Sequence, residues 1–202
     1  MKKMYPSIYN YIQSLIPEME LIPRPRQELL LRLAEQVQPG VSLTFICTHN
    51  SRRSHFGQIW AAVAAAWYGV EGVKTYSGGT EATAFNPRAV AALERAGFRV
   101  KNPGGVNPVY RVSFSESEPE LECFSKVYDH PANPSQDFIA VMTCSEADEN
   151  CPFIPGATLR VQLTYEDPKE ADGTPEETAR YDERCRQIAT EMFFLFSQVK
   201  NQ

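Results

Sequence analysis

The feature of this sequence that most restricts its fold is an alternation of short apolar runs and helical segments between residues 42 and 97. Residues 42–46 and 73–76 are short and prone to β structure, which predicts two strands. Residues 54–68 and 87–96 follow a helical pattern, and a glycine comes directly after each. Strands that alternate with helices pair in parallel, so we expect a sheet with helices on its faces.

The remainder of the chain extends this pattern. Residues 138–143 and 159–163 predict two further strands, and residues 175–199 predict one long amphipathic helix. We therefore expect an α/β fold, a three-layer sandwich with a four-stranded parallel sheet, over residues 41–202.

Two segments lie outside this pattern. Residues 1–40 predict two short helices that are interrupted by prolines, and they form an N-terminal helical extension. Residues 101–137 are rich in proline, glycine and acidic side chains, so we expect an insertion that is mostly loop, with a hairpin near residues 109–114.

Charge, apolar runs and cysteine number exclude several classes of protein. The net charge is −5 and there is no basic tract, which argues against binding nucleic acid. No apolar run approaches the length of a membrane span, and no apolar segment follows the N-terminal lysines, so neither a span nor a secretory signal is expected. The five cysteines are an odd number and cannot all pair within the chain. We expect reduced thiols and a cytoplasmic location.

The most informative segment surrounds Cys47, where a predicted strand ends and a predicted helix begins seven residues later. Backbone N–H groups in such a loop can converge on one point, to which the helix N-terminus adds positive charge. This predicts a cradle for a tetrahedral oxyanion, closed by the planar guanidinium of Arg53. The positive field favours the thiolate form of Cys47, and Ser54 can donate a hydrogen bond to the sulfur. The cradle residues are Thr48, His49, Asn50, Ser51, Arg52 and Arg53.

The Cys-x5-Arg-Ser loop that begins at Cys47 resembles the signature of the low-molecular-weight protein tyrosine phosphatase superfamily. Residues 77–80, Ser-Gly-Gly-Thr, and the late Asp167-Pro168 pair support the resemblance. It implies that Cys47 is the nucleophile and that Asp167 is the general acid, because an oxygen leaving group needs a proton. Without this resemblance, Asp167 would be interpreted as a turn residue.

A second pair of cysteines, Cys144 and Cys151, follows a predicted strand in a Cys-x6-Cys segment. The segment resembles the redox pair of one branch of the superfamily, the thioredoxin-coupled arsenate reductases. The resemblance implies a thiol-disulfide relay from Cys47 through Cys144 to Cys151, with a thioredoxin-like reductant as partner. If the segment is helical when reduced, seven residues place the two Cα atoms about 10 Å apart, so the helix must unwind on oxidation.

Alternatives remain open at this stage. A phosphatase acting on phosphotyrosine or small phosphoesters would use the same loop, with Cys144 and Cys151 as protection against oxidation. A non-catalytic module that binds oxyanions or senses redox state is a third hypothesis. We expect no metal and no cofactor, since the cysteine spacing is unusual for zinc. Cys185 is interpreted as a packing residue, and Cys123 is assigned no role. His55 is interpreted as solvated, and the N-terminal helices as a cap on the sheet or a surface for a homodimer.

Overall fold

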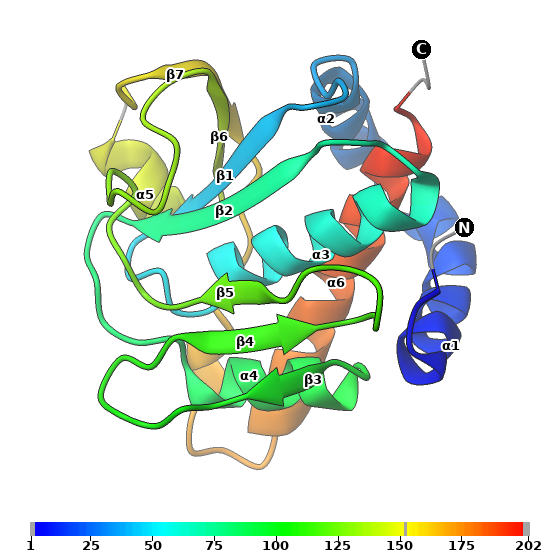
Figure 1. Cartoon of the computed structure of the whole chain (residues 1–202), viewed down its shortest axis with the longest axis vertical. Helices are drawn as coiled ribbons and strands as arrows, with labels where there is room; N and C mark the ends of the chain where they lie inside the picture. The colour runs from blue at the N-terminus through cyan, green and yellow to red at the C-terminus, as the bar shows by residue number, and fades with distance from the viewer. Residues whose placement is uncertain (1–2, 152, 200–202) are drawn as a thin grey trace.

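The computed structural model describes residues 3–151 and 153–199 (Figure 1). Its centre is a four-stranded parallel sheet with the order β2-β1-β6-β7. The expected α/β fold with this sheet is confirmed. The strands are β1 (Ser42–Cys47), β2 (Lys74–Gly79), β6 (Phe138–Met142) and β7 (Ala157–Gln162).

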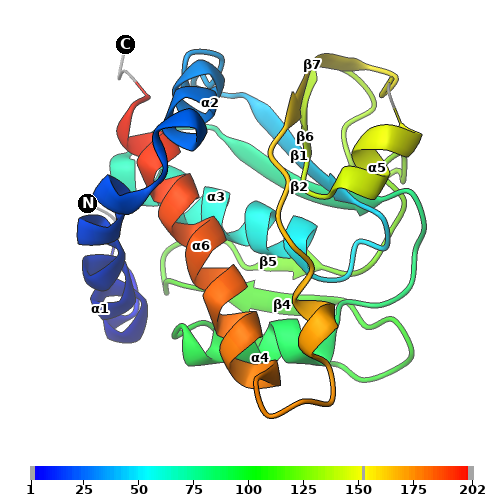
Figure 2. The same ribbon diagram turned by 180° about the vertical axis from the view of Figure 1, so that it is seen from behind.

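Helices cover the sheet as the alternating pattern predicts. Figure 2 shows α6 running across α3 and α4, and α3 packs against β1, β2 and α6. On the other face, the short α5 contacts β1 and β6. These helices are α3 (Arg53–Tyr68), α4 (Pro87–Arg95), α5 (Ser145–Asn150) and α6 (Glu177–Ser197). Gly69, which ends α3, has φ 71° and thus adopts the left-handed conformation that glycine favours.

The buried strand β6 divides the interior into two apolar clusters, because successive side chains of a strand point to opposite faces. Ile139 and Val141 join the main core, which lies on the side of α3 and α6. Phe138, Ala140 and Met142 join a smaller cluster on the side of α5. Strand β6 therefore contributes side chains to the clusters on both faces of the sheet.

The N-terminal segment forms α1 (Pro6–Leu15), the 3₁₀ helix η1 (Ile16–Leu21) and α2 (Arg24–Ala34). The two predicted helices are confirmed, and all three elements pack against α6. Their buried apolar side chains belong to the main core, namely Ile8, Ile12, Leu15, Leu30 and Leu33. None of the helices in the described ranges is long and apolar enough to cross a membrane.

Most of residues 101–137 lie outside helices and strands, as expected, but the segment also contributes to a sheet that the prediction of one hairpin near residues 109–114 did not include. An antiparallel sheet with the order β3-β4-β5 forms from β3 (Arg99–Lys101), β4 (Tyr110–Ser113) and β5 (Leu121–Cys123). Strands of three or four residues are too short to show a clear alternation in sequence. They are stabilised by burial instead, since Val112 and Cys123 are part of the main core.

Candidate active site

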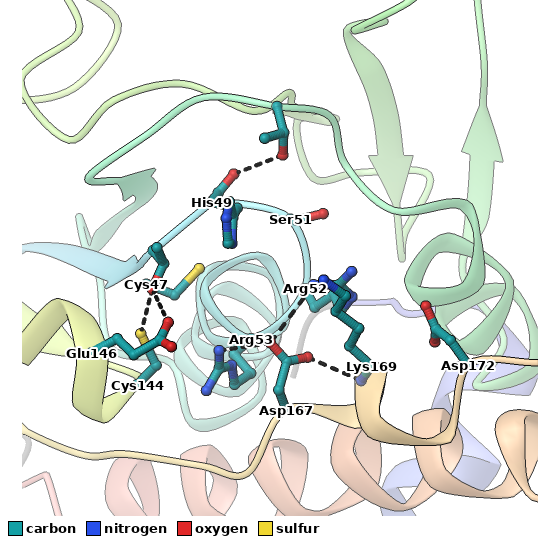
Figure 3. A network of polar contacts seen from close by, with 12 residues as sticks. Cys47, His49, Ser51, Arg52, Arg53, Cys144, Glu146, Asp167, Lys169 and Asp172 are labelled. Atoms are coloured by element: carbon teal, nitrogen blue, oxygen red, sulfur yellow. Dashed lines mark hydrogen bonds and ion pairs between the residues drawn. The ribbon is translucent and has the colours of Figure 1, made fainter.

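Cys47 is the last residue of β1, and the loop of residues 48–52 leads from it into α3 (Figure 3). Its side chain is buried, and its Sγ lies 3.1 Å from the Oγ of Ser54 in the first turn of α3. Strand, loop and helix N-terminus thus meet at one sulfur atom. This is the arrangement that the sequence predicts for the Cys47 loop.

The loop is held in shape by Asn50, which has φ 44°. Asparagine tolerates this left-handed conformation better than most residues. The Asn50 Nδ2 donates to the Oγ of Ser54 at 2.9 Å, and its Oδ1 accepts from the backbone N–H of Lys126 at 3.0 Å. One side chain therefore joins the loop to α3 and to the segment after β5.

Backbone carbonyls of the loop are bonded to residues outside it. The Cys47 carbonyl accepts from Thr80 N at 3.2 Å, and the Thr48 carbonyl accepts from Glu81 N at 2.8 Å. The Ser51 carbonyl accepts from Asn86 N at 2.9 Å. In a trans peptide the N–H points away from the carbonyl, and the described chain has no cis peptide. The N–H groups that follow these carbonyls hence point toward the inner side of the loop.

This close approach of the loop to β2 requires glycine at position 79. A Cβ atom there would lie 2.6 Å from the Thr48 carbonyl oxygen and 2.8 Å from the Asn50 nitrogen. Both distances are far below van der Waals contact. Gly79 pairs with Cys47 in the sheet and lies inside β2, which continues beyond the predicted strand end at residue 76.

Arg53 and Asp167 lie side by side although 114 positions separate them in the sequence. Figure 3 shows the two side chains turned toward each other, and Arg53 Nη2 donates to Asp167 Oδ2 at 2.7 Å. Arg53 Nη1 donates to the Tyr165 carbonyl at 2.9 Å. The buried Nε of Arg53 has no hydrogen-bond partner in the described part of the chain. This N–H has no hydrogen bond that an anion would have to displace.

Arg52 adds a second cation beside the same carboxylate. Its Nη1 lies 3.7 Å from Asp167 Oδ2, and its Nε donates to the Tyr181 hydroxyl at 3.0 Å. The Tyr181 hydroxyl donates in turn to Asp172 at 2.8 Å, and burial followed by this bond raises the pKa of Tyr181 to about 12. Tyr181 therefore stays protonated at neutral pH and fixes the Arg52 guanidinium.

Cys144 reaches the loop from the other side. It precedes α5, and its buried Sγ lies 3.4 Å from the Thr48 Oγ1. Thr48 Oγ1 also donates to Glu146 Oε2 at 3.0 Å. Cys151 follows the last residue of α5 and is half-buried. Residues 145–150 are helical, so a helix separates the two cysteines, which is the condition on which the expected unwinding depends.

The five cysteines fall into two groups by location, and all are free thiols. Cys47 and Cys144 lie in the smaller apolar cluster, and Cys151 packs against it. Cys123 and Cys185 lie in the main core, where burial raises the pKa of each thiol to about 12. A thiol with such a pKa is a poor nucleophile at neutral pH.

A cleft of about 420 Å³ opens beside the loop. Arg53, Cys144 and Asp167 line it, together with Glu146 and Tyr165. The side chains of His49 and Ser51 turn elsewhere: His49 Nε2 lies 3.7 Å from Glu81, and Ser51 Oγ donates to the Ala84 carbonyl at 2.7 Å. These two residues can serve an anion only through their backbone N–H groups.

Several contacts of the site are absent from the sequence prediction. Arg53 is bonded to Tyr165, Arg52 to Tyr181, and Thr48 to Glu146. No local sequence pattern identifies these three partners. In the described residues, no group of three histidine, cysteine, aspartate or glutamate side chains could hold a metal ion.

The expectation that His55 is solvated is wrong. His55 is fully buried and stacks on Phe85 with 3.9 Å between ring centroids. Burial and, to a smaller extent, the charge of Lys126 hold the pKa of His55 well below its usual value. Its neutral ring therefore packs beneath the loop.

Two curated relatives of the chain are arsenate reductases. The arsenate reductase of Bacillus subtilis (strain 168) is 30% identical over 144 residues, which are 70% of this chain and 84% of that protein. The arsenate reductase of Bacillus licheniformis is 27% identical over 160 residues, covering 78% of this chain and 96% of that protein. No protein-family model matches the chain.

A solved structure shows the same fold. The low molecular weight phosphotyrosine phosphatase of Vibrio cholerae O395 has a TM-score of 0.52 at 15% identity, covering 78% of this chain and 95% of that chain. At this identity the likeness shows that the chain has the fold of that phosphatase. The similarity to the curated relatives shows that the chain belongs to the arsenate reductase family of enzymes.

Proposed function

We propose that this protein reduces arsenate with Cys47 as nucleophile and Cys144 and Cys151 as a thiol-disulfide relay. One observation supports the relay above all others: the Cys144 sulfur lies 3.4 Å from the hydroxyl of Thr48, the residue next to Cys47. A phosphatase needs no second thiol at this place. The two relatives described above are named arsenate reductases, which supports the same reaction.

The oxyanion would be held by the inward N–H groups of Thr48, His49 and Arg52 and by the guanidinium of Arg53. The Nε of Arg53 is buried without a partner in the described residues, so it can donate to an oxygen at little cost. Its Nη2 now donates to Asp167, and an arsenate oxygen would take over that donor. Asp167, once released, would protonate the departing oxygen as general acid.

The proposed steps balance in atoms and electrons. The Cys47 thiolate attacks arsenic, and one arsenate oxygen leaves as water after protonation. The Cys144 thiolate then attacks the Cys47 sulfur; a disulfide forms, and the electron pair of the arsenic–sulfur bond stays on arsenic, which leaves as arsenite. Cys151 attacks Cys144 and releases Cys47. A dithiol partner of the thioredoxin type reduces the Cys144–Cys151 disulfide, which we propose occurs in the cytoplasm.

We also propose that residues 41–202 form the catalytic domain, with residues 1–40 as an extension and about 101–137 as an insertion. The parallel sheet begins at Ser42, and the cleft is lined by residues from position 53 onward. The extension packs on α6, away from the loop of residues 48–52.

Three measurements test the proposal. The protein is incubated with thioredoxin, thioredoxin reductase and NADPH, and NADPH oxidation is followed with arsenate. Hydrolysis of an aryl phosphate and binding of inorganic phosphate are measured on the same protein. We expect oxidation that depends on arsenate and is lost in Cys47→Ser. Hydrolysis of the aryl phosphate without arsenate-dependent oxidation would instead establish the phosphatase, and binding of phosphate without any turnover would establish the non-catalytic module.

A further inference from the structure

Tyr165 connects the proposed oxyanion cradle to the interior of the protein. Its backbone carbonyl accepts a hydrogen bond from Arg53 Nη1 at 2.9 Å, and it lies two residues before Asp167. Its side chain is buried, and its hydroxyl donates to Glu191 Oε2 at 2.7 Å. The Tyr165 carbonyl that holds Arg53 therefore belongs to a residue anchored at two points, by the hydroxyl on Glu191 and by the backbone N–H, which donates to the Thr143 carbonyl at 3.1 Å.

Glu191 is a buried carboxylate on α6, and its cation comes from the N-terminal segment. Arg26 of α2 donates from Nε to Glu191 Oε2 at 3.0 Å, and its Nη2 lies 2.8 Å from the same oxygen. The Arg26 guanidinium also lies over the Tyr165 ring, 4.7 Å from its centroid. Arg26 therefore contacts the Glu191 carboxylate and also the ring of Tyr165, whose hydroxyl is bonded to that carboxylate.

The three groups depend on one another energetically. A buried carboxylate without a cation is strongly unfavourable, so loss of Arg26 would force Glu191 to move, to take up a proton or to admit water. Burial, followed by the charge of Glu191, raises the pKa of Tyr165 well above its usual value, so the phenol remains a donor. A change at Glu191 would then be transmitted to the Tyr165 hydroxyl and ring.

We propose that Arg26 is a positioning residue for the oxyanion cradle, acting through Glu191 and Tyr165 on the guanidinium of Arg53. The N-terminal helices thereby contribute to substrate affinity as well as to the core. This inference rests on the proposed role of Arg53 in binding the oxyanion.

The test compares two bridges between the N-terminal segment and α6. Arg26→Met breaks the bridge to Glu191 and keeps an apolar side chain over Tyr165. Glu18→Gln is the matched control, because Glu18 of η1 pairs with Arg186 of α6 at 2.8 Å and does not belong to this chain of contacts. Affinity for inorganic phosphate is measured by calorimetry, and KM and kcat are measured with arsenate.

We expect Arg26→Met to weaken phosphate binding and to raise the KM for arsenate about tenfold, since a misplacement of about 1 Å can cost about 100-fold and a smaller displacement of Arg53 should cost less. Glu18→Gln should leave both values near those of the wild type. Equal affinities in the two variants would overturn the inference, and a fall in kcat alone would show that Arg26 only maintains the folded fraction.

Tyr165→Phe provides a second variant if Arg26→Met does not fold. It keeps the carbonyl and the ring but removes the hydroxyl that donates to Glu191, so weaker phosphate binding is expected again. Wild-type affinity in Tyr165→Phe would contradict the inference. A wild-type protein that does not bind phosphate would refute the cradle itself, which is a different result from equal affinities among proteins that bind.

Discussion

At the scale of single residues, Asn50, Ser54 and Cys47 form a buried series of contacts that fixes the position of one proton. The Asn50 amide is oriented by the Lys126 N–H, so its Nδ2 faces Ser54 and donates to the hydroxyl oxygen. The Ser54 hydrogen is then free to point at the Cys47 sulfur, 3.1 Å away. This bond would stabilise a thiolate more than a thiol.

Ser54→Ala should accordingly lower kcat without changing the KM for arsenate or the affinity for phosphate. A hydrogen bond to a charged group contributes about 1.5–3 kcal/mol, which corresponds to a loss of about 10- to 100-fold in kcat. Steady-state kinetics measures this. Thr190→Ala, which removes a buried hydroxyl that bonds to the Arg186 carbonyl, controls for lost stability. An unchanged kcat in Ser54→Ala would contradict the assignment of the proton.

Lys126 gives a prediction for pH dependence. Burial lowers the pKa of Lys126 from 10.5 to about 8 in the folded protein. Between these two values the unfolded chain binds more protons than the folded one, so the free energy of unfolding contributed by Lys126 rises with pH. Relative to Lys126→Met, the wild type should gain about 1–3 kcal/mol between pH 7 and pH 10. Urea unfolding of both proteins measures this gain, and a difference independent of pH would refute it.

At the scale of elements, the short helix α5 is the part of the fold that the proposed chemistry must change. Its end is held by Arg160 of β7, whose Nε donates to the Cys151 carbonyl at 3.1 Å and whose Nη2 donates to the Asp148 carbonyl at 2.6 Å. Helical bonds run from Asp148 N to the Cys144 carbonyl and from Cys151 N to the Ala147 carbonyl. A disulfide between the flanking cysteines is incompatible with this helix.

Oxidation of the Cys144–Cys151 pair should therefore remove hydrogen-exchange protection from the amides of Asp148 and Cys151. Hydrogen exchange with mass spectrometry on the reduced and oxidised Cys47→Ser protein measures this. Peptides from α3 serve as the internal control and should keep their protection. A disulfide that forms while these two amides stay protected would contradict the predicted unwinding.

Most elements of the proposed catalytic domain could be predicted because their signals lie within short stretches of the sequence. Apolar runs and glycine stops place β1, α3, α4, β6 and α6 within about two residues of their observed bounds. The antiparallel sheet of β3, β4 and β5 could not be predicted, because its short strands depend on burial against distant residues. The strand, loop and helix start around Cys47 could be predicted because residues 47–54 are contiguous. Tyr165, Tyr181 and Glu146 were not, since they are more than 90 positions away in sequence from the groups they hold.

At the scale of the whole molecule, the N-terminal helices are part of the main core. Ile12 of α1 is fully buried, whereas Leu21 at the end of η1 is largely exposed. The same segment supplies Arg26 to Glu191. The extension is therefore expected to contribute to folding of the entire chain, together with its proposed effect on the oxyanion cradle.

Ile12→Ala should lower the free energy of unfolding by about 2–5 kcal/mol, because it leaves a cavity in the core. Leu21→Ala, the matched control on the exposed surface, should change it by less than about 0.5 kcal/mol. Chemical denaturation measures both values. Equal, small effects would show that the N-terminal helices are only loosely attached to the catalytic domain.

The central claim is that Cys144 takes part in arsenate reduction while Cys47 alone suffices for attack on an oxyanion. The most direct measurement is turnover of Cys144→Ser with two substrates, arsenate in the presence of the thioredoxin system and an aryl phosphate. The relay predicts that arsenate-dependent NADPH oxidation disappears and that any aryl phosphate hydrolysis stays close to the wild-type rate. Arsenate reduction that continues in Cys144→Ser, or the loss of both activities, would contradict it.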